Sequence, residues 1–533
     1  MSVFVAIQRG REEERKMKLD GSRLLVGGLL LVFGSMAAQA ERTVGILKHD
    51  SSAYPGYTLF SPLNTYKTYL LDNDGRVVNE WESTLLPGVA AYLLEDGSLL
   101  RTGQAAGNSD FVAGGQGGQV ERFNWDGTLE WSFRYSEFGQ YKSHHDIQPL
   151  PNGNVLILAW EMKTEEECIA AGREPGTMQD GELWPEHVIE VTPTGFDTGD
   201  IVWEWHAWDH LVQNHNASLP NYGDPNESPG KMHINYDTGL YDGDWLHANS
   251  LHYNPQLDQI MINMHRLGEF WIIDHSTTTE EAAGPAGDIL YRWGNASVYS
   301  RNASADDRVL WGQHDARWIP EGYPGEGNIL IFNNGRNRPE GAFTTVEEIT
   351  PPILADGTYE MGSDGMYGPA EPEIVYMADE PTDFYASFIS GAERLPNGNT
   401  IICSGPWGEF FEITDAGDIV WFYHNPDTST GVLSQGDLPA GQGGFSTTNR
   451  TFRASRFGID YPGFIGKDMT PGLPIEIYDA DCLPDLDGSG IIDVNDLLNV
   501  INNWGTGVGD VQGDGKTDVN DLLFVVDQWG LCN

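Results

Sequence analysis

Two histidines lie at matching points of segments that repeat between residues 41 and 470, and a third lies two positions before such a point. His145 and His314 each stand six residues before a Pro-containing turn, and His247 stands two positions before the matching Asn249. Near pH 7 a neutral imidazole can attack an electrophile, and a second imidazole can exchange a proton with the leaving or entering group. The spacing therefore indicates a nucleophilic or acid–base site that contains His145, His247 and His314.

Arginines follow two of these histidines in the sequence. Arg266 comes after the segment INMH, and Arg336 and Arg338 lie in FNNGRNR. A guanidinium binds the oxygens of an anionic group in a bidentate manner, which suits a group that is transferred with its negative charge spread over several oxygens. We expect these arginines to hold such an anion beside the histidines.

Two short phrases recur and predict the framework that positions these side chains. One is a strand, an Asp/Gly turn and a Trp-bearing strand; the other alternates apolar and polar residues around a Pro-Asn-Gly-like turn. Alternation with period two around such turns predicts β-hairpins. Six units of roughly 70 residues over about 420 residues predict an all-β, six-bladed β-propeller at residues 41–470. The blades should pack through Trp81, Trp131, Trp203, Trp205 and Trp421.

In a propeller, equivalent points of the repeats form a ring around the axis. His145, His247 and His314 are therefore predicted to face one another across one mouth of the channel. His252 lies five residues after His247, so the two should point to opposite faces of a strand. We expect His252 to have a structural role.

Several segments of the array resemble the bacterial aryl-sulfate sulfotransferase family. They are GYTLFSP from Gly56, HHDIQPLPNGN from His144, DWLHANSLHYN from Asp244, GQHDARW from Gly312, FNNGRNR from Phe332 and SGAERLPNGNTIICSG from Ser390. The resemblance implies a six-bladed propeller that moves a sulfuryl group from an aryl sulfate donor to a phenolic acceptor through a histidine, without a nucleotide cofactor. It also implies that His247, His314 and an arginine of the NNGxxR type, with Arg338 favoured slightly over Arg336, belong to the active site.

The segment from Phe384 to Asn399, where the resemblance places the family's modified histidine, contains no histidine. Three interpretations follow. Another histidine of the ring is the nucleophile, Ser390 replaces the missing one, or the propeller is a non-catalytic binding or scaffold domain.

The last 53 residues, 481–533, have a different character from the array, from which residues 471–480 separate them. Two tandem segments fit the 12-position calcium loop and predict two bound Ca²⁺ ions. The expected ligands are Asp485, Asp487, Ser489, Ile491, Asp493 and Asp496 in the first loop, and Asp510, Gln512, Asp514, Lys516, Asp518 and Asp521 in the second.

Each loop precedes a short helical pattern that ends in Trp-Gly, and the pair resembles a type I dockerin. The resemblance implies a cohesin-like protein partner, and an intramolecular partner competes with it. Because the ends of two antiparallel units meet, we expect a Cys482–Cys532 disulfide. Cys168 and Cys403 either pair with each other or stay free.

The N-terminal segment 1–40 reads as a secretory signal peptide, with Met17 as its expected start. A basic region precedes 11 apolar residues, Leu24–Gly34, and the cleavage site Ala38-Gln39-Ala40. Eleven residues are too few to span a bilayer, so we expect an exported protein, periplasmic, extracellular or cell-surface, without a membrane span. The 30 Lys and Arg against 79 Asp and Glu give a net charge of −49, which argues against nucleic acid as a partner.

Overall fold

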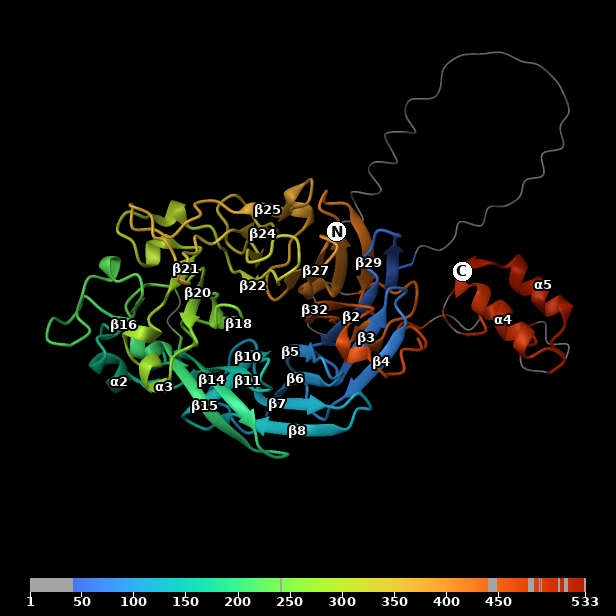
Figure 1. Cartoon of the computed structure of the whole chain (residues 1–533), viewed down its shortest axis with the longest axis horizontal. Helices are drawn as coiled ribbons and strands as arrows, with labels where there is room; N and C mark the ends of the chain where they lie inside the picture. Colours follow the sequence, from blue (N-terminus) through green and yellow to red (C-terminus); the bar gives the residue numbers. More distant parts are fainter. Residues whose placement is uncertain are drawn as a thin grey trace, which may run out of the picture.

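The computed structural model describes residues 42–239, 242–439, 448–477, 484–487, 489, 491–506, 509–511 and 516–531. The expected signal peptide and both cysteines of the expected C-terminal disulfide lie outside these residues. Six antiparallel sheets of four or five strands are arranged around a common axis (Figure 1). This arrangement confirms the prediction of a mostly β, six-bladed propeller.

The first three blades use strands from the N-terminal half and one strand from the C-terminal end of the array. Blade 1 consists of β32 (Thr451–Gly458), β2 (Gly56–Pro62), β3 (Lys67–Asp72) and β4 (Val77–Glu82), and blade 2 of β5 (Pro87–Leu93), β6 (Leu99–Gln104), β7 (Gly118–Phe123) and β8 (Leu129–Arg134). Blade 3 consists of β9 (Ser136–Glu137), β10 (Tyr141–Pro149), β11 (Val155–Glu161), β14 (Glu186–Pro193) and β15 (Gly199–His206).

The other three blades follow in sequence order. Blade 4 consists of β18 (Ala248–Asn254), β19 (Gln259–Met264), β20 (Glu269–Asp274) and β21 (Tyr291–Trp293), and blade 5 of β22 (His314–Trp318), β23 (Ile329–Asn333), β24 (Thr345–Ile349) and β25 (Glu373–Tyr376). Blade 6 consists of β26 (Gly391–Arg394), β27 (Thr400–Ser404), β28 (Glu409–Ile413), β29 (Ile419–His424) and β1 (Gly45–His49).

Shorter elements decorate the blades. The small strand pairs are β12 (Lys163–Thr164) with β13 (Glu182–Leu183), β16 (Leu211–Val212) with β17 (Met232–His233), and β30 (Asp427–Thr428) with β31 (Gly431–Val432). The short helices α2 (Glu165–Ala170) and α3 (Thr279–Ala282) begin with capping boxes at Thr164 and Thr278. None of the described helices is both long enough and apolar enough to span a bilayer.

The two ends of the array close the ring at two places. β32 pairs with β2 and forms the innermost strand of blade 1, while β1 pairs with β29 at the outer edge of blade 6. Both blades are therefore built from segments that are far apart in the sequence. A strand that completes a sheet removes an open edge, which is how this fold avoids an unpaired side.

Buried tryptophans join five of the six pairs of neighbouring blades, and four of the five, Trp81, Trp131, Trp205 and Trp421, are among those that the repeats predict. Each indole N–H donates to a carbonyl oxygen in the following blade, at 2.9 Å from Trp81 to Asn124 and at 3.0 Å from Trp131 to Thr198. The corresponding donors and acceptors at three other interfaces are Trp205 and Gly287, Trp293 and Pro369, and Trp421 and Asn73. A buried indole needs such a partner, so the bond and the packing together fix the blades relative to one another.

The innermost strands carry irregularities at similar positions. Register shifts mark bulges in β5, β10, β18 and β22. Near these bulges, residues other than glycine have positive φ, with values of 94° at Val89, 47° at His145, 51° at His247 and 54° at Asp315. Ser390, directly before the regular strand β26, also has a positive φ, of 89°. Bulges re-aim side chains, and left-handed backbone at such residues is uncommon. The bulged positions are those from which the histidines project.

The remaining two cysteines are free and buried, Cys168 in α2 and Cys403 in β27. They belong to different clusters of the hydrophobic core. Burial raises the pKa of the Cys168 thiol to about 12. Of the two alternatives in the sequence analysis, the structure selects unpaired thiols with low reactivity.

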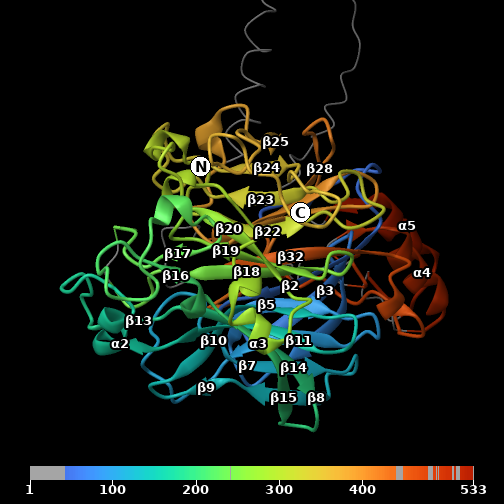
Figure 2. The ribbon, with the colours of Figure 1, turned by 60° about the vertical axis from the view of Figure 1, so that its left-hand side comes forward.

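The C-terminal module contains two nine-residue helices, α4 (Val494–Asn502) and α5 (Val519–Asp527). They contact each other and lie outside the ring of blades (Figure 2). A small core of Ile492, Val500, Val511 and Val525 fills the space between them. β33 (Ile491–Ile492) pairs antiparallel with β34 (Gly530–Leu531), which brings the end of the described chain back to the first loop.

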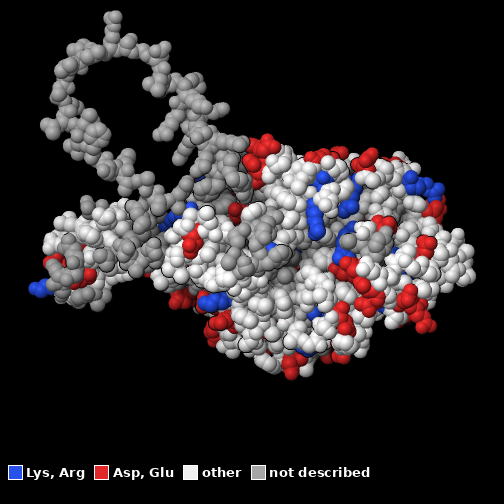
Figure 3. Space-filling model, turned by 180° about the vertical axis from the view of Figure 1, so that it is seen from behind, with Lys and Arg blue, Asp and Glu red and all other residues white. Residues whose placement is uncertain are grey.

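Charged side chains are spread over the surface of the molecule. On the face in Figure 3, acidic side chains are scattered, with basic ones between them. The large negative net charge is therefore distributed on this face and does not form a single acidic patch.

Candidate active site

Five imidazoles form a continuous arc at the inner strands of blades 3, 4 and 5. The ring centroids of neighbours lie 5.2 Å apart for His144 and His145, 4.7 Å for His145 and His247, 5.3 Å for His247 and His265, and 5.2 Å for His265 and His314. Phe452 of β32 lies inside the arc, with its centroid 6.2 Å from His145 and 6.4 Å from His314. The structure thus brings the three histidines singled out by the repeats together and adds His144 and His265.

His314 has a defined tautomer. Its Nδ1 lies 2.8 Å from Asn334 Oδ1 and 3.2 Å from the Gly312 carbonyl oxygen, so this nitrogen carries the hydrogen. Its Nε2 accepts from the Ile389 amide at 3.2 Å. Burial lowers the pKa of His314 to about 3. This side chain is a neutral imidazole whose lone pair is at Nε2.

His247 is backed by a carboxylate. Its Nδ1 lies 2.5 Å from Asp244 Oδ2, and Arg266 lies 3.5 Å from the same carboxylate. Although burial opposes ionisation of Asp244, the charges of His247 and Arg266 lower the pKa of this carboxyl below its ordinary value. An ionised carboxylate can only accept a hydrogen bond, so Nδ1 of His247 carries the hydrogen and Asp244 holds the ring in one orientation.

His145 is connected to a buried carboxyl through His144. The two Nδ1 atoms of His144 and His145 lie 2.9 Å apart, and Nε2 of His144 lies 2.7 Å from Glu186 Oε2. The other carboxyl oxygen of Glu186 accepts from the Ala248 amide at 2.7 Å. His144 also stacks on Trp160 at a centroid distance of 3.8 Å. All three titratable groups are buried and held in one orientation.

A glycine-rich loop, residues 105–117, contacts the arc. The Gly115 carbonyl accepts from the His145 amide at 2.7 Å. A Cβ at Gly115, where φ is +71°, would lie 2.2 Å from Nε2 of His145, and one at Gly114 would lie 3.8 Å from Nε2 of His247. Only glycine allows this close approach at residue 115.

The three candidate arginines lie in different surroundings. Arg266 pairs with Asp242 and Asp244 beside His247. Arg336 is exposed. A Cβ atom added to Gly312 would lie 3.1 Å from the Cβ of Arg336 and 3.5 Å from Nε2 of His265, so Arg336 and His265 both lie beside Gly312. Arg338 instead donates to Thr345 Oγ1 at 3.0 Å and lies 3.6 Å from Glu347.

Arg338 therefore lines a separate pocket of about 610 Å³ between blades 4 and 5, together with Trp311 and Glu347. The slight preference for Arg338 from the sequence does not fit this placement. Arg336 is the arginine of the FNNGRNR segment that lies on the histidine side, and no ion pair is described for it.

Ser390 does not reach the arc as a free hydroxyl. It is fully buried, its Oγ accepts from the Gly405 amide at 3.0 Å, and it lies 3.3 Å from the Phe388 carbonyl oxygen. These bonds tie the residue that precedes β26 to the loop that follows β27. The hydroxyl is engaged in the structure and is not placed as a substitute nucleophile.

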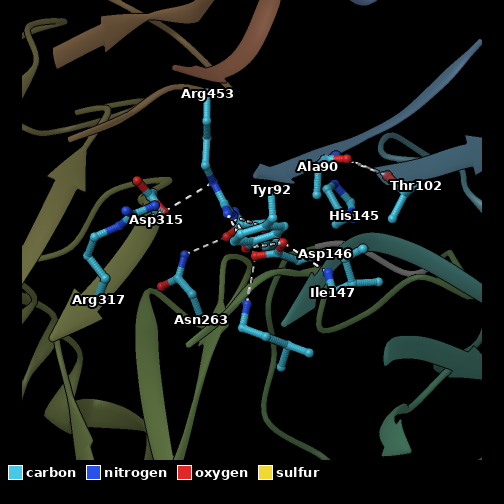
Figure 4. A network of polar contacts seen from close by, with 12 residues as sticks. Ala90, Tyr92, Thr102, His145, Asp146, Ile147, Asn263, Asp315, Arg317 and Arg453 are labelled. Carbon is cyan, nitrogen blue, oxygen red and sulfur yellow. Dashed lines mark hydrogen bonds and ion pairs between the residues drawn. The ribbon is translucent and has the colours of Figure 1, made fainter. Parts of the chain in front are cut away.

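A charged network lies directly beneath the arc (Figure 4). Arg453 of β32 reaches Asp146 of blade 3 at 2.7 Å and Asp315 of blade 5 at 3.1 Å. Tyr92 donates to Asp146 at 2.9 Å, and Arg317 pairs with Asp315 at 2.7 Å. The space beside Arg453 and Tyr92 amounts to about 10 Å³, room for one water at most.

Several of these groups were not predicted from the sequence. Two local patterns could have indicated His144 and His265: the doublet His144-His145 and the position of His265 directly before Arg266. Nothing local distinguishes Glu186, Asp146, Asp315 or Arg453, because their side-chain partners are distant in the sequence or in other blades.

The first calcium loop gathers its carboxylates. Ligand oxygens of Asp485, Asp487 and Asp496 all lie within 4.8 Å of one another. Asp496 is buried and accepts from the amides of Leu486, Asp487 and Asp493 at 2.7–3.1 Å, and burial raises its pKa. Ser489 Oγ donates to the Ile491 carbonyl oxygen, and Asp493 caps α4. An all-oxygen set of this kind fits Ca²⁺.

The second loop repeats part of this arrangement. Asp518 caps α5, and Asp521 accepts from the Val511 amide at 3.0 Å and from the Asp518 amide at 2.7 Å. Asp510 and Lys516 are described, with Lys516 exposed, whereas Gln512 and Asp514 lie outside the described residues.

Comparison with known proteins identifies one family. A family model described as Arylsulfotransferase (ASST) matches residues 48–418, and no curated protein matches the chain. Among solved structures, a protein of unknown function from Bacteroides caccae is 11% identical with a TM-score of 0.38, covering 76% of this chain and 99% of the other. Virginiamycin B lyase from Staphylococcus aureus is 10% identical with a TM-score of 0.33, covering 72% and 85%. At such TM-scores these two likenesses carry no argument.

Proposed function

Because the chain belongs to the arylsulfotransferase family, whose model spans most of the propeller, we propose that the histidine arc transfers a sulfuryl group from an aryl sulfate to a phenolic acceptor. The observation that carries this proposal is the arc of neighbouring imidazoles, in which Asn334 and Gly312 fix the protonated nitrogen of His314. Such a site can accept a sulfuryl group on one ring and stabilise its charge with the others. No nucleotide cofactor is needed for this reaction.

We assign the nucleophile to His314. A side chain with a pKa near 3 remains neutral at physiological pH, and its lone pair is at Nε2. In this structure the Ile389 amide donates to that nitrogen at 3.2 Å, so attack requires this hydrogen bond to open. The Nδ1–H bonds to Asn334 and Gly312 stabilise the positive charge that develops when Nε2 attacks sulfur. A weakly basic imidazole is also a good leaving group when the phenol attacks the sulfated intermediate. Both half-reactions therefore suit this residue.

We assign the binding of the sulfuryl oxygens to His247, Arg266 and Arg336. Asp244 holds the His247 ring at Nδ1, and Arg266 is held by the same carboxylate. The exposed Arg336 approaches from the side of His265. Positive groups on two sides of the transferred group stabilise the charge that spreads over its oxygens in the transition state.

The test is mass spectrometry of the protein after incubation with an aryl sulfate alone. The expected product is a protein heavier by one SO₃, with the modification on the peptide that contains His314 and its loss after a phenol is added. Release of phenol from the donor without any sulfated protein would contradict the covalent mechanism. Absence of any transfer would favour the alternative that the propeller is a non-catalytic binding or scaffold domain.

For the C-terminal module we propose two bound Ca²⁺ ions, one in each loop. The carboxylates of Asp485, Asp487 and Asp496, with the Ile491 carbonyl, would hold the first ion. Asp510, Asp518 and Asp521 would take part in the second. Gln512 offers a neutral oxygen where the first loop has Asp487, so the second site should be the weaker one.

We further propose that this module is a dockerin-like docking domain. Eight apolar residues at matched positions of the two units are 45–58% exposed, which is unusual for large apolar side chains. They are Val494, Leu498, Ile501 and Trp504 in the first unit, and Val519, Leu523, Val526 and Trp529 in the second.

Each residue of the first set has its counterpart 25 positions later, so the module presents two equivalent apolar faces. A cohesin-like protein is the partner that this proposal names, and a surface of the same chain is the alternative. Size-exclusion chromatography of the full chain with a cohesin, in calcium and in EDTA, tests it. We propose that residues 1–40 direct export, which N-terminal sequencing of the mature protein tests.

A further inference from the structure

The histidine arc has a buried branch that the transfer scheme above does not use. Glu186, His144 and His145 form an unbroken hydrogen-bonded line, with 2.7 Å between the carboxyl and the first ring and 2.9 Å between the two rings. In both bonds each atom, a ring nitrogen or a carboxyl oxygen, donates when it carries a hydrogen and accepts when it does not. The outer end of the line is Nε2 of His145, to which no hydrogen bond is described.

We propose that Glu186 and His144 form a proton relay that lets His145 act alternately as the acid and the base of the sulfuryl transfer. The proposal rests on the proposed function, because it assigns the proton that the two half-reactions require. His145 touches the reacting oxygen, whereas Glu186 and His144 act through it.

One arrangement of hydrogens makes His145 an acid. Protonated Glu186 donates to Nε2 of His144, the Nδ1–H of His144 donates to Nδ1 of His145, and Nε2 of His145 carries a hydrogen. As the S–O bond of the donor breaks, the departing phenolate takes this hydrogen. His145 receives one at Nδ1 from His144, His144 receives one at Nε2 from Glu186, and Glu186 becomes a carboxylate.

The second half-reaction reverses the transfer. The phenolic acceptor gives its O–H proton to Nε2 of His145 as its oxygen bonds to sulfur and the His314 N–S bond breaks. The same two hydrogen bonds then return one proton to Glu186. Both imidazoles are neutral before and after each step. The relay lacks one proton between the two half-reactions, when Glu186 is a carboxylate, and regains it in the second.

The burial of the three groups favours this neutral relay over an isolated imidazolium. His144, His145 and Glu186 are 1%, 3% and 0% exposed, and charging a ring at such depth is costly. Burial lowers the pKa of both imidazoles well below the ordinary value and raises that of Glu186 well above it. The groups that face the relay are Lys142 on the same strand, Asp244 and His247 before β18, His265 and Arg266 after β19, and His314 of β22.

The relay predicts a dependence on the leaving group that a structural role would not produce. Glu186→Gln keeps the bond to the Ala248 amide and can donate to His144, but it cannot release a proton. We expect the release of phenol from phenyl sulfate in the first turnover to slow about 100-fold, the usual scale of a lost acid. Release of the far more acidic 4-nitrophenol from 4-nitrophenyl sulfate, which needs no proton, should change less than about threefold.

Two further variants keep the test decisive. His144→Phe retains the ring stacked on Trp160 and interrupts the relay, so it should reproduce the same selectivity. Glu190→Gln is the matched control, because Glu190 lies on the same strand and bonds to His275 at 3.1 Å away from the arc. It should leave both donors unaffected. Equal slowing of both donors by Glu186→Gln and His144→Phe would overturn the relay.

A measurement independent of turnover separates this proposal from the proposed function. With ¹⁵N-labelled histidine, the hydrogen of His145 should move from Nε2 to Nδ1 as Glu186 ionises with rising pH in the wild type. In Glu186→Gln it should remain on Nε2. If no donor is turned over but the tautomer switches, the transfer activity fails and the relay stands. If the tautomer is the same in both proteins at all pH values, the relay is wrong.

Discussion

Adjacent residues of the same inner strands form two layers of side chains around the propeller axis. The two layers differ in the charge of their side chains. His145, His314 and Phe452 belong to the layer at the mouth, and the next residue in each strand, Asp146, Asp315 or Arg453, belongs to the layer beneath. The mouth layer is a set of mostly neutral imidazoles, whereas the lower layer contains full charges that are paired across the axis.

This comparison shows that two adjacent residues of one strand can have different roles: the first reacts and the second stabilises the fold. In the lower layer, the carboxylates of Asp146 and Asp315 raise the pKa of Arg453 even though burial alone would lower it. Its charges are satisfied by one another and by backbone amides. The mouth layer leaves several ring nitrogens without protein partners. The fixed lower layer can therefore hold in place side chains that must remain free to react.

The largest effect should come from breaking the lower layer. Arg453→Leu leaves two buried carboxylates unpaired, so we expect the free energy of unfolding to fall by about 3–5 kcal/mol. Urea unfolding measures it. Arg301→Leu, which removes a pair with exposed Asp224 and Glu227, should cost less than about 1 kcal/mol. If Arg453→Leu costs no more than this control, the axial network does not stabilise the fold.

The next largest effect should come from the mouth layer and should spare stability. We expect His314→Ala and His247→Ala each to lower kcat at least about 100-fold. His252→Ala is the control, because this half-buried ring accepts from the Trp318 amide and contacts the Trp318 ring, and it is not part of the arc. Steady-state kinetics and circular dichroism decide the matter. Wild-type turnover in both arc variants would refute the site.

A smaller effect should distinguish the two arginines of one loop. Arg336→Ala removes an exposed charge beside His265, and we expect kcat to fall about tenfold with a modest change in KM. Arg338→Ala should change kcat less than about threefold, because its guanidinium is engaged with Thr345 and Glu347. The reverse order of effects would restore the preference that the sequence alone suggests.

The smallest effect on catalysis should come from the calcium loops, which lie outside both layers. Asp496→Asn should remove one of two ions measured by calorimetric titration of the full chain, and turnover should not change. At a calcium concentration of 100 times Kd, each site stabilises the module by about 2.7 kcal/mol. Binding of two ions by Asp496→Asn would contradict the assignment of the first loop.

Local patterns in the sequence were sufficient for the repeat, the blades and the first approximation of the site. Strand alternation and Asn-Gly turns depend on neighbouring residues, so the six blades follow from them. The spacing of His145, His247 and His314 placed them on one ring because each repeat folds in nearly the same way. The calcium loops are equally local, since all the proposed ligands of each lie within 12 residues.

Only the tertiary structure decided which groups meet across blades. The pairing of Arg453 with Asp146 and Asp315 joins three blades. Within one blade, the contact of His144 with Glu186 joins residues that are 42 positions apart in the sequence. Arg336 and Arg338 are two positions apart in the same loop. The conformation of this loop places Arg336 beside the arc and Arg338 in a separate pocket. Side-chain direction in a loop depends on packing with distant segments, which local spacing does not determine.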